Sequence, residues 1–230
     1  EENYDLFTRH KIYAIMPRTI KLEQRIEYVK QDKWVAFSLA EFEKLFVNKE
    51  IEYERPMKVL VDIANGHMLK LFELAKKAKD NYNDGLILMI GNIANPETYE
   101  MAVNVRADYV RCSIGTGKGC LSSSNVGVHY PLAYLIDEIA SIKEALSKKN
   151  AKLPKIIADG GVRNYSDVIK ALALGADYVM IGGVFASMFE SAAETKDAFQ
   201  ALINPMEVID EEKKRFMIKN YNIHKTFYGM

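Results

Sequence analysis

The chain has 230 residues, 49% of them hydrophobic, and its 31 Lys and Arg residues balance 31 Asp and Glu residues. This neutral balance does not favour nucleic acid or a membrane surface as a partner, and no apolar run approaches the ~20 residues of a membrane span. Two cysteines make no disulfide framework, and Glu1 to Asp5 lack the basic and apolar regions of a signal peptide, so we expect a cytoplasmic protein.

Seven short apolar runs predict the strands of a parallel sheet, because runs of this kind suit strands that are covered on both faces. They start at Lys11 (KIYAIM), Trp34 (WVAFSL), Lys58 (KVLVDI), Leu86 (LILMIG), Tyr109 (YVRCSI), Ile156 (IIADGG) and Tyr178 (YVMIGG). Successive starts lie 22 to 28 residues apart, except for the 47 residues between Tyr109 and Ile156. The spacing is typical of repeated β/α units, and the long interval predicts an additional, functional loop.

Helix signals fill the intervals between these runs. Asn95-Pro96-Glu97 offers a cap, a first-turn proline and an acid at a helix start. Residues 132–146 and 168–172 place apolar side chains at helical spacing, and Gly175 offers a stop after the second helix. Alternating residues in the segment 216–228 predict a hairpin.

The order of these elements predicts an α/β fold, a (β/α)₈ TIM barrel, formed by residues 1–230 as a single catalytic domain. A closed barrel needs eight strands, whereas seven runs are visible in the sequence. We therefore expect the first barrel strand to be absent from the chain, and we expect the same of a flap beyond Met230.

Polar and glycine residues follow the predicted strands at their carboxyl ends, where barrel enzymes build their active sites. They are Asp62, Asn92, the loop from Gly115 to Cys120, Asp159-Gly160-Gly161 and Gly182-Gly183. Two glycine pairs that end the last two strands predict a phosphate site made by backbone N–H groups. Tight strand-to-helix turns are the alternative for the glycine pairs, and helix caps are the alternative for Asp62 and Asp159.

Cys120 ends a loop in which Gly115, Gly117 and Gly119 alternate with other residues. A thiol on such a loop is a candidate nucleophile, because backbone N–H groups or the nearby Lys118 would lower its pKa. The alternating glycines also allow backbone carbonyls to turn toward a cation. Cys112 lies inside a predicted strand and is expected to be inert packing.

These motifs resemble, in this order, the IMP dehydrogenase/GMP reductase family. They are Asp62-Ile63-Ala64-Asn65-Gly66-His67, Gly91-Asn92, Ile114-Gly115-Thr116-Gly117-Lys118-Gly119-Cys120, Ala158-Asp159-Gly160-Gly161 and Met180-Ile181-Gly182-Gly183. The resemblance extends from about Lys58 to Met230, and residues 1–57 match loosely from the second barrel strand. Two details resemble the reductase branch, namely residues 62–66 and the C-terminal Phe227-Tyr228-Gly229-Met230.

The resemblance implies a GMP reductase, which converts GMP to IMP and ammonia with NADPH. Cys120 would add to C2 of the purine, ammonia would leave, hydride from NADPH would reach C2 of the thioimidate, and the adduct would collapse to IMP. Ser122 matches a family threonine that assists proton transfer, and Glu190 matches the acid that partners it.

The resemblance also implies binding residues and an assembly. Asp159 would bind the ribose, and the phosphate or base would contact Gly160, Gly161, Gly182, Gly183, Lys118, Gly229 and Met230. The cofactor pocket would include Asp62, Asn92 and Arg111. The carbonyls of Gly115, Gly117 and Cys120 match a loop that binds a monovalent cation, usually potassium, and family members usually form homotetramers.

Three alternatives stay open. IMP dehydrogenase would use the same cysteine to convert IMP to XMP with NAD. A catalytically inactive nucleotide-binding paralogue is the second, because Lys118 stands where the family has a phosphate-binding serine and Leu121 replaces a threonine. A flavin-dependent barrel with similar phosphate loops is the third, and the Cys120 loop argues against it.

Overall fold

The structure is a computed structural model, which describes residues 4–52, 56–117, 120, 122–148, 152–186, 188, 195–196, 202–203, 210–220 and 224–225. Its strands are β1 (Ile15–Met16), β2 (Trp34–Phe37), β3 (Met57–Asp62), β4 (Leu86–Ile93), β5 (Tyr109–Cys112), β6 (Lys155–Asp159), β7 (Tyr178–Met180), β8 (Thr195–Lys196), β9 (Leu202–Ile203) and β10 (His224–Lys225). Its helices are α1 (Tyr4–Arg9), α2 (Leu22–Lys30), α3 (Leu39–Phe42) with the π-helical η1 (Glu43–Val47), α4 (Leu69–Tyr82) with the 3₁₀ turn η2 (Asn83–Gly85), α5 (Thr98–Asn104), α6 (Ser122–Val126), α7 (Leu132–Ser147), α8 (Tyr165–Ala173), α9 (Gly183–Ala186) and α10 (Glu211–Asn220).

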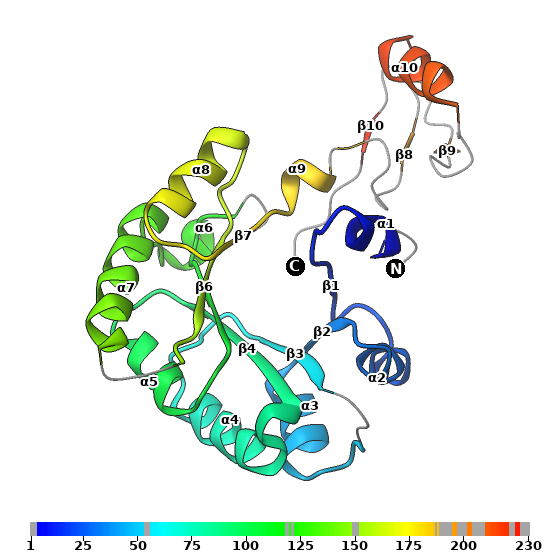
Figure 1. Ribbon diagram of the computed structural model, residues 1–230. Coiled ribbons are helices and arrows are strands. Elements are labelled where there is room, and N and C mark those ends of the chain that lie inside the picture. Colours follow the sequence, from blue (N-terminus) through cyan, green and yellow to red (C-terminus); the bar gives the residue numbers. More distant parts are fainter. Residues whose placement is uncertain are drawn as a thin grey trace.

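All seven strands predicted from the sequence form and join one parallel sheet. They pair in chain order from β1 to β7, and each neighbouring pair is parallel. The sheet curls into an arc with helices around its outside, and β1 and β7 are its two edges in the part of the chain that is described (Figure 1). This is a partial (β/α)₈ barrel, as the sequence predicts.

The sheet separates two hydrophobic cores, because successive side chains of a strand point to opposite faces. Val59 and Val61 on β3 face outward into the large core between the sheet and the helices, where Leu135 of α7 also lies. Leu60, between these valines, faces inward and packs with Trp34 in the smaller core inside the arc. The inward-facing side chains therefore form a packed core within the arc, as in the interior of a barrel.

A repeated Ala-Asp-Tyr-Val sequence closes the amino end of the sheet. Asp108, just before β5, accepts the backbone N–H of Leu88 on β4 at 2.9 Å. Asp177, just before β7, accepts the backbone N–H of Ile156 on β6 at 2.7 Å. Each aspartate therefore joins its own strand to the preceding one, and lysines neutralise both carboxylates.

One local prediction is confirmed and one needs correction. Asn95 is a cap as predicted, since its Oδ1 accepts the N–H of Glu97 at 3.0 Å, and the regular helix α5 starts three residues later, at Thr98. The hairpin predicted for 216–228 is wrong in its first part, where residues 211–220 form α10. Asp210 Oδ1 accepts two backbone N–H groups of the first turn of α10, and such a cap outweighs a weak alternation of side chains.

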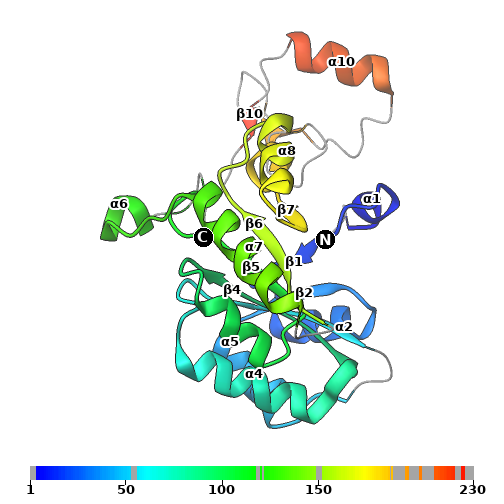
Figure 2. The same cartoon turned by 60° about the vertical axis from the view of Figure 1, so that its left-hand side comes forward.

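The remaining elements lie outside the parallel sheet. Strands β8, β9 and β10 form a small antiparallel sheet in the order β10-β8-β9. Figure 2 shows α10 near this sheet and α6 standing out to one side of α7. Helix α8 forms where the sequence predicts it, but Ile169 and Leu172 on its apolar face are 46% and 42% exposed among the described residues.

Candidate functional site

Polar side chains from four neighbouring strands meet at the carboxyl end of the sheet. Asp62 ends β3 and Asp159 ends β6, while Arg111 lies on β5. Asn92 lies one residue before the end of β4. Because parallel strands share a direction, the residues that the sequence places at separate strand ends come to one edge of the sheet.

Arg111 connects the two carboxylates of this edge. Its Nη2 donates to Oδ1 of Asp62, and its Nε lies 3.6 Å from Oδ2 of Asp159. The same Oδ2 accepts the side-chain N–H of Asn92 at 2.8 Å. The side chains of Arg111, Asp62 and Asp159 are 11%, 15% and 24% exposed, so solvent screens their charges less than it would at the surface.

Arg18 extends this charged network, and sequence reasoning missed it. Its Nη1 donates to the backbone carbonyl of Asp62 at 3.2 Å, and its Nε lies 3.4 Å from Oδ2 of the same residue. Arg18 follows β1 with only Pro17 between them. The strand-end rule that selected Asp62 therefore could have selected Arg18 as well.

Gly91 provides the room that this arrangement needs. It lies in register with Asp62 on one side and with Arg111 on the other. A Cβ added to Gly91 would come within 2.4 Å of the Arg111 carbonyl oxygen and 2.8 Å of its Cβ. Its φ of +146° also disfavours any other residue. The Gly91-Asn92 motif therefore has a structural role next to its predicted functional one.

The Nε of Arg111 is a buried donor with no hydrogen-bond partner among the described residues. Oδ2 of Asp159 lies 3.6 Å from this nitrogen, which is too long for a hydrogen bond. A buried N–H without a partner is unfavourable, and such groups in a site often pair with a ligand. The site thus has one unused donor between its two carboxylates.

The Cys120 loop packs directly against the end of β6. Thr116 Oγ1 donates to the backbone carbonyl of Asp159 at 3.3 Å. The backbone N–H of Cys120 donates to the carbonyl of Gly117 at 3.0 Å, which folds the loop back on itself. Cys120 is half-buried, so its thiol is neither packed in the core nor fully in solvent.

The surroundings of Cys120 favour the thiolate. Partial burial by itself raises the pKa of the thiol, and Asp159 acts in the same direction. Hydrogen bonds from the hydroxyl and the backbone N–H of Ser122, and from the backbone N–H of Gly115, outweigh both and lower the pKa below its ordinary value. Cys112 is fully buried in β5, and burial raises the pKa of its thiol.

The two glycine pairs differ in what surrounds them. Gly160 and Gly161 have φ of +88° and +74°, and a Cβ at Gly160 would lie 2.9 Å from Thr116 Oγ1. These backbone angles favour glycine, and the Cys120 loop contacts this pair closely. A Cβ at Gly182 or Gly183 would meet no atom of the described residues within 4 Å. As far as the chain is described, the second pair leaves room for a ligand to approach the backbone.

Neither aspartate of the site is a helix cap. Met68 precedes α4 and makes no side-chain cap, and Asp62 is engaged by arginines. Asn164 caps α8 by accepting the N–H of Asp167 at 3.1 Å, which leaves Asp159 outside that helix. The cap alternatives for Asp62 and Asp159 are therefore wrong.

The predicted cation loop is described only in part. The carbonyl of Gly115 lies 3.4 Å from Nδ1 of His129, and the carbonyl of Gly117 accepts the N–H of Cys120. Lys118, Glu190, Gly229 and Met230, which the sequence assigns to the phosphate, the proton relay and the base, lie outside the described residues.

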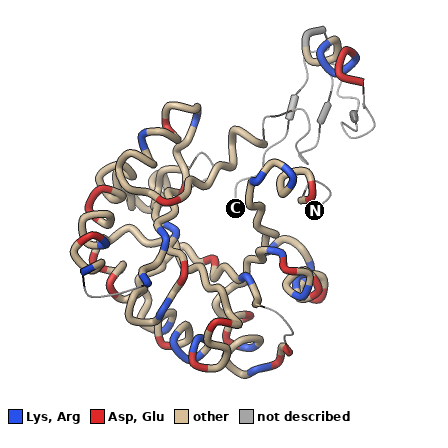
Figure 3. The backbone as a smooth tube through the Cα atoms, viewed as in Figure 1, with Lys and Arg blue, Asp and Glu red and all other residues tan. Residues whose placement is uncertain are grey.

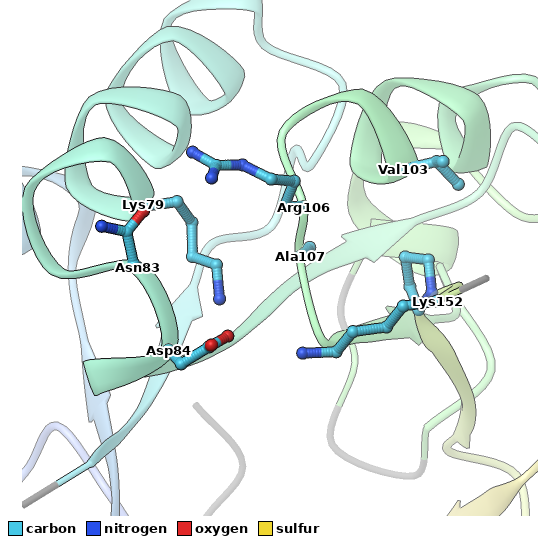
Figure 4. A pocket seen from close by; sticks show the side chains of 8 residues that line it. Lys79, Asn83, Asp84, Val103, Arg106, Ala107 and Lys152 are labelled. Carbon is cyan, nitrogen blue, oxygen red and sulfur yellow. The ribbon is translucent and has the colours of Figure 1, made fainter. Parts of the chain in front are cut away.

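A cavity of about 380 Å³ lies at the opposite, amino end of the sheet. Figure 4 shows Lys79 and Lys152 pointing toward each other across it. Both lysines bind Asp108, at 2.8 and 2.7 Å, and Arg106 binds Asp80. Asp84 also lines the cavity, so three carboxylates balance these three cations and the cavity is a neutral structural cluster.

Other kinds of site find no support among the described residues. None of their helices has both the length and the apolar character to cross a membrane. No three His, Cys, Asp or Glu side chains of this part converge as metal ligands do. Figure 3 shows acidic and basic residues interspersed along the outer helices.

Comparison with known proteins identifies relatives of the chain. Residues 49–200 match the family described as "IMP dehydrogenase / GMP reductase domain". The chain is 40% identical over 136 residues to inosine-5'-monophosphate dehydrogenase of Borreliella burgdorferi, an alignment that covers 59% of this chain and 32% of that protein.

Two GMP reductases align with more of the chain. The reductase of Helicobacter pylori is 32% identical over 182 residues, which cover 75% of this chain and 52% of the relative. The reductase of Caenorhabditis elegans is 26% identical over 246 residues, which cover 99% of this chain and 56% of the relative. The chain thus spans about half, or less, of the length of these relatives.

Proposed function

Because the chain belongs to the IMP dehydrogenase/GMP reductase family, we propose that it is a GMP reductase that converts GMP to IMP and ammonia with NADPH. The state and position of the Cys120 thiol are the main support for this proposal. The Cys120 thiol is half-buried, has a lowered pKa and sits on a loop that packs against Asp159 at the carboxyl end of the sheet. A nucleophile for the purine and a carboxylate for its ribose therefore lie side by side.

The nucleotide would bind between Cys120 and the two glycine pairs. Gly182 and Gly183 have no neighbour within 4 Å of an added Cβ among the described residues, which suits a phosphate that is held by backbone N–H groups. Asp159 would accept the ribose hydroxyls, because its Oδ1 has no partner in the described part of the chain while Asn92 holds its Oδ2. The fixed carboxylate would set the orientation of the purine toward the sulfur.

Cys120 would act as the covalent nucleophile. Its thiolate would form a bond to C2 of the purine, and the C2–N bond to the amino group would break as that group takes up a proton and leaves as ammonia. Ser122, whose hydroxyl already bonds the sulfur, would pass this proton, with Glu190 as its proposed partner. Release of IMP would break the C2–S bond and return the thiolate.

The mouth of the barrel suits a nicotinamide cofactor. NADPH, when bound, supplies the hydride that replaces the amino group at C2. Asp62, Asn92 and Arg111 would hold it, and the unused Nε–H of Arg111 offers a donor to an acceptor atom of the ligand. Arg18, which is 38% exposed, lies at the outer end of the same network.

The reductase is preferred to IMP dehydrogenase on two grounds. Residues 62–66 resemble the reductase form of this strand end, and GMP reductases align with more of the chain than the dehydrogenase does. IMP dehydrogenase stays the second candidate, since the dehydrogenase of Borreliella burgdorferi is the more identical relative over its shorter alignment. Potassium at the Cys120 loop, a homotetramer and a cytoplasmic location belong to the proposal too.

A paired assay tests this function. The protein is mixed with GMP and NADPH, or with IMP and NAD, and the absorbance of the reduced nicotinamide is followed. We expect oxidation of NADPH that depends on GMP, and we expect Cys120→Ala to abolish turnover while GMP still binds. Reduction of NAD with IMP would establish the dehydrogenase instead, and GMP binding without turnover would support the inactive paralogue.

A further inference from the structure

We propose that His67 is a positioning residue of this site, which ties the loop that carries Asp62 to the loop that carries Asn92. The inference rests on the proposed function for the roles of Asp62 and Asn92, but the tie itself rests on geometry alone. His67 comes five residues after the end of β3, and its ring touches residues that follow β4.

Both ring nitrogens of His67 are engaged, and their partners determine the tautomer. The backbone N–H of Ala94 lies 3.0 Å from Nε2, and a backbone N–H can only donate, so Nε2 is the acceptor. The proton of the neutral ring is then on Nδ1, which donates to Thr98 Oγ1 at 2.7 Å. Thr98, the first residue of α5, is 5% exposed, so this second contact is anchored in the core.

Backbone contacts join the same two loops closer to the site. The N–H of Asn92 donates to the carbonyl of Ile63 at 2.8 Å, and the N–H of Gly66 donates to the carbonyl of Asn92 at 2.8 Å. A Cβ at Gly66 would lie 2.3 Å from that carbonyl oxygen. The chain therefore needs glycine at position 66, and this places His67 where it reaches Ala94.

These contacts make one unit of the two strand ends. Asn92 is held through both its backbone N–H and its carbonyl, and its side chain then reaches Oδ2 of Asp159 at 2.8 Å. Asp62 begins the same loop and meets Arg111. His67 adds two side-chain hydrogen bonds from the Asp62 loop to Ala94 and Thr98, beyond the backbone hydrogen bonds at Asn92.

The neutral ring is required for this tie. A second proton on the ring would place an N–H at Nε2, where it would face the N–H of Ala94. Burial alone accounts for a lowered pKa at His67, which keeps the ring neutral at ordinary pH. The ring thus acts through its two hydrogen bonds and carries no charge into the site.

Three variants separate the tie from a general effect on folding. His67→Phe keeps a planar aromatic ring, somewhat larger than imidazole, and removes both hydrogen bonds, whereas His67→Gln retains an acceptor near the position of Nε2. Thr98→Val removes only the contact at Nδ1. For His67→Phe we expect KM for NADPH to rise about fivefold to tenfold, as the loss of one or two hydrogen bonds implies, with a smaller change in kcat. His67→Gln should restore most of the loss, and Thr98→Val should be intermediate.

A readout without turnover keeps this inference separate from the proposed function. In His67→Phe, the amide hydrogens of Asn92 and Ala94 should exchange with solvent faster, while the rate at which iodoacetamide modifies Cys120 should stay unchanged. Unaltered exchange at these amides, or a KM for NADPH equal to that of the wild type, would overturn the inference. Absence of any reaction of wild-type protein with GMP would instead refute the proposed function, and the exchange result would still decide the role of His67.

Discussion

The guanidinium of Arg111 on β5 binds the carboxylate of Asp62 on β3, across the strand that separates them. Gly91 of β4 lies in register with both residues, and its lack of a side chain leaves the space that Arg111 occupies. Arg111 also approaches Asp159 on β6, so one cation is shared by two acids. The proposed ribose and cofactor contacts therefore depend on the same side chain.

We expect Arg111→Lys to impair the site although it keeps the charge. A lysine carries one compact charge and cannot present separate donors to Asp62 and Asp159 as a guanidinium does. The value of kcat/KM should fall by about tenfold or more, with a lower melting temperature. The matched control is Arg18→Lys, which should lower kcat/KM less, because Arg18 is 38% exposed and within the described part of the chain binds Asp62 alone. Equal effects of the two variants would contradict the shared-cation account.

Cys120 should react with iodoacetamide at neutral pH well before Cys112 does. The lowered pKa of Cys120 supplies thiolate, whereas burial raises the pKa of Cys112 and blocks access to it. Ser122→Ala removes one hydrogen bond to the sulfur, so the pKa of Cys120 should rise and its reaction at neutral pH should slow severalfold. Mass spectrometry of the labelled peptides measures both rates across pH. An unchanged pH profile in Ser122→Ala would rule out this role for the hydroxyl.

The two glycine pairs should respond differently to alanine. Gly160→Ala strains a residue with φ of +88° and brings its Cβ to 2.9 Å from Thr116, so the melting temperature should fall. The Cβ of Gly182→Ala meets no described atom within 4 Å, so this variant should leave the melting temperature unchanged. If Gly182 binds the phosphate, the same variant should weaken GMP binding in a calorimetric titration. Normal affinity in Gly182→Ala would remove Gly182 from the phosphate site.

Stability in acid should depend on Glu41, which belongs to a capping box with Ser38 at the start of α3. Burial by itself raises the pKa of Glu41, but hydrogen bonds from Arg25 and Ser38 outweigh it and lower the pKa from 4.5 to about 2. Because the pKa of Glu41 is lower in the folded state than in the unfolded state, the ionised Glu41 stabilises the folded protein. This contribution to the free energy of unfolding is complete above pH 4.5 and is lost as pH falls toward 2. The free energy of unfolding of wild type and Glu41→Gln should therefore converge below pH 4.5, as denaturant titrations can measure. A difference that stays constant with pH would contradict this account.

Local patterns were sufficient to predict much of the fold. The seven apolar runs became β1 to β7 because burial on both faces leaves a clear signature in each run, independent of distant residues. The cap at Asn95 was also predicted from a local pattern, and its Oδ1 accepts the N–H of Glu97. The hairpin predicted for 216–228 failed in its first part, because Asp210 lies outside the alternating segment and caps α10.

The sequence by itself determined which residues stand at the ends of strands, and thereby placed Asp62, Asn92, Asp159 and the Cys120 loop at one edge. Only the tertiary structure decided how they pair. Arg18 and Asp62 are 44 residues apart in the chain and Asn92 and Asp159 are 67 apart, so no local pattern encodes these contacts. They arise because the curl of a parallel sheet brings separate strand ends within hydrogen-bonding distance, and side-chain geometry then selects the partners.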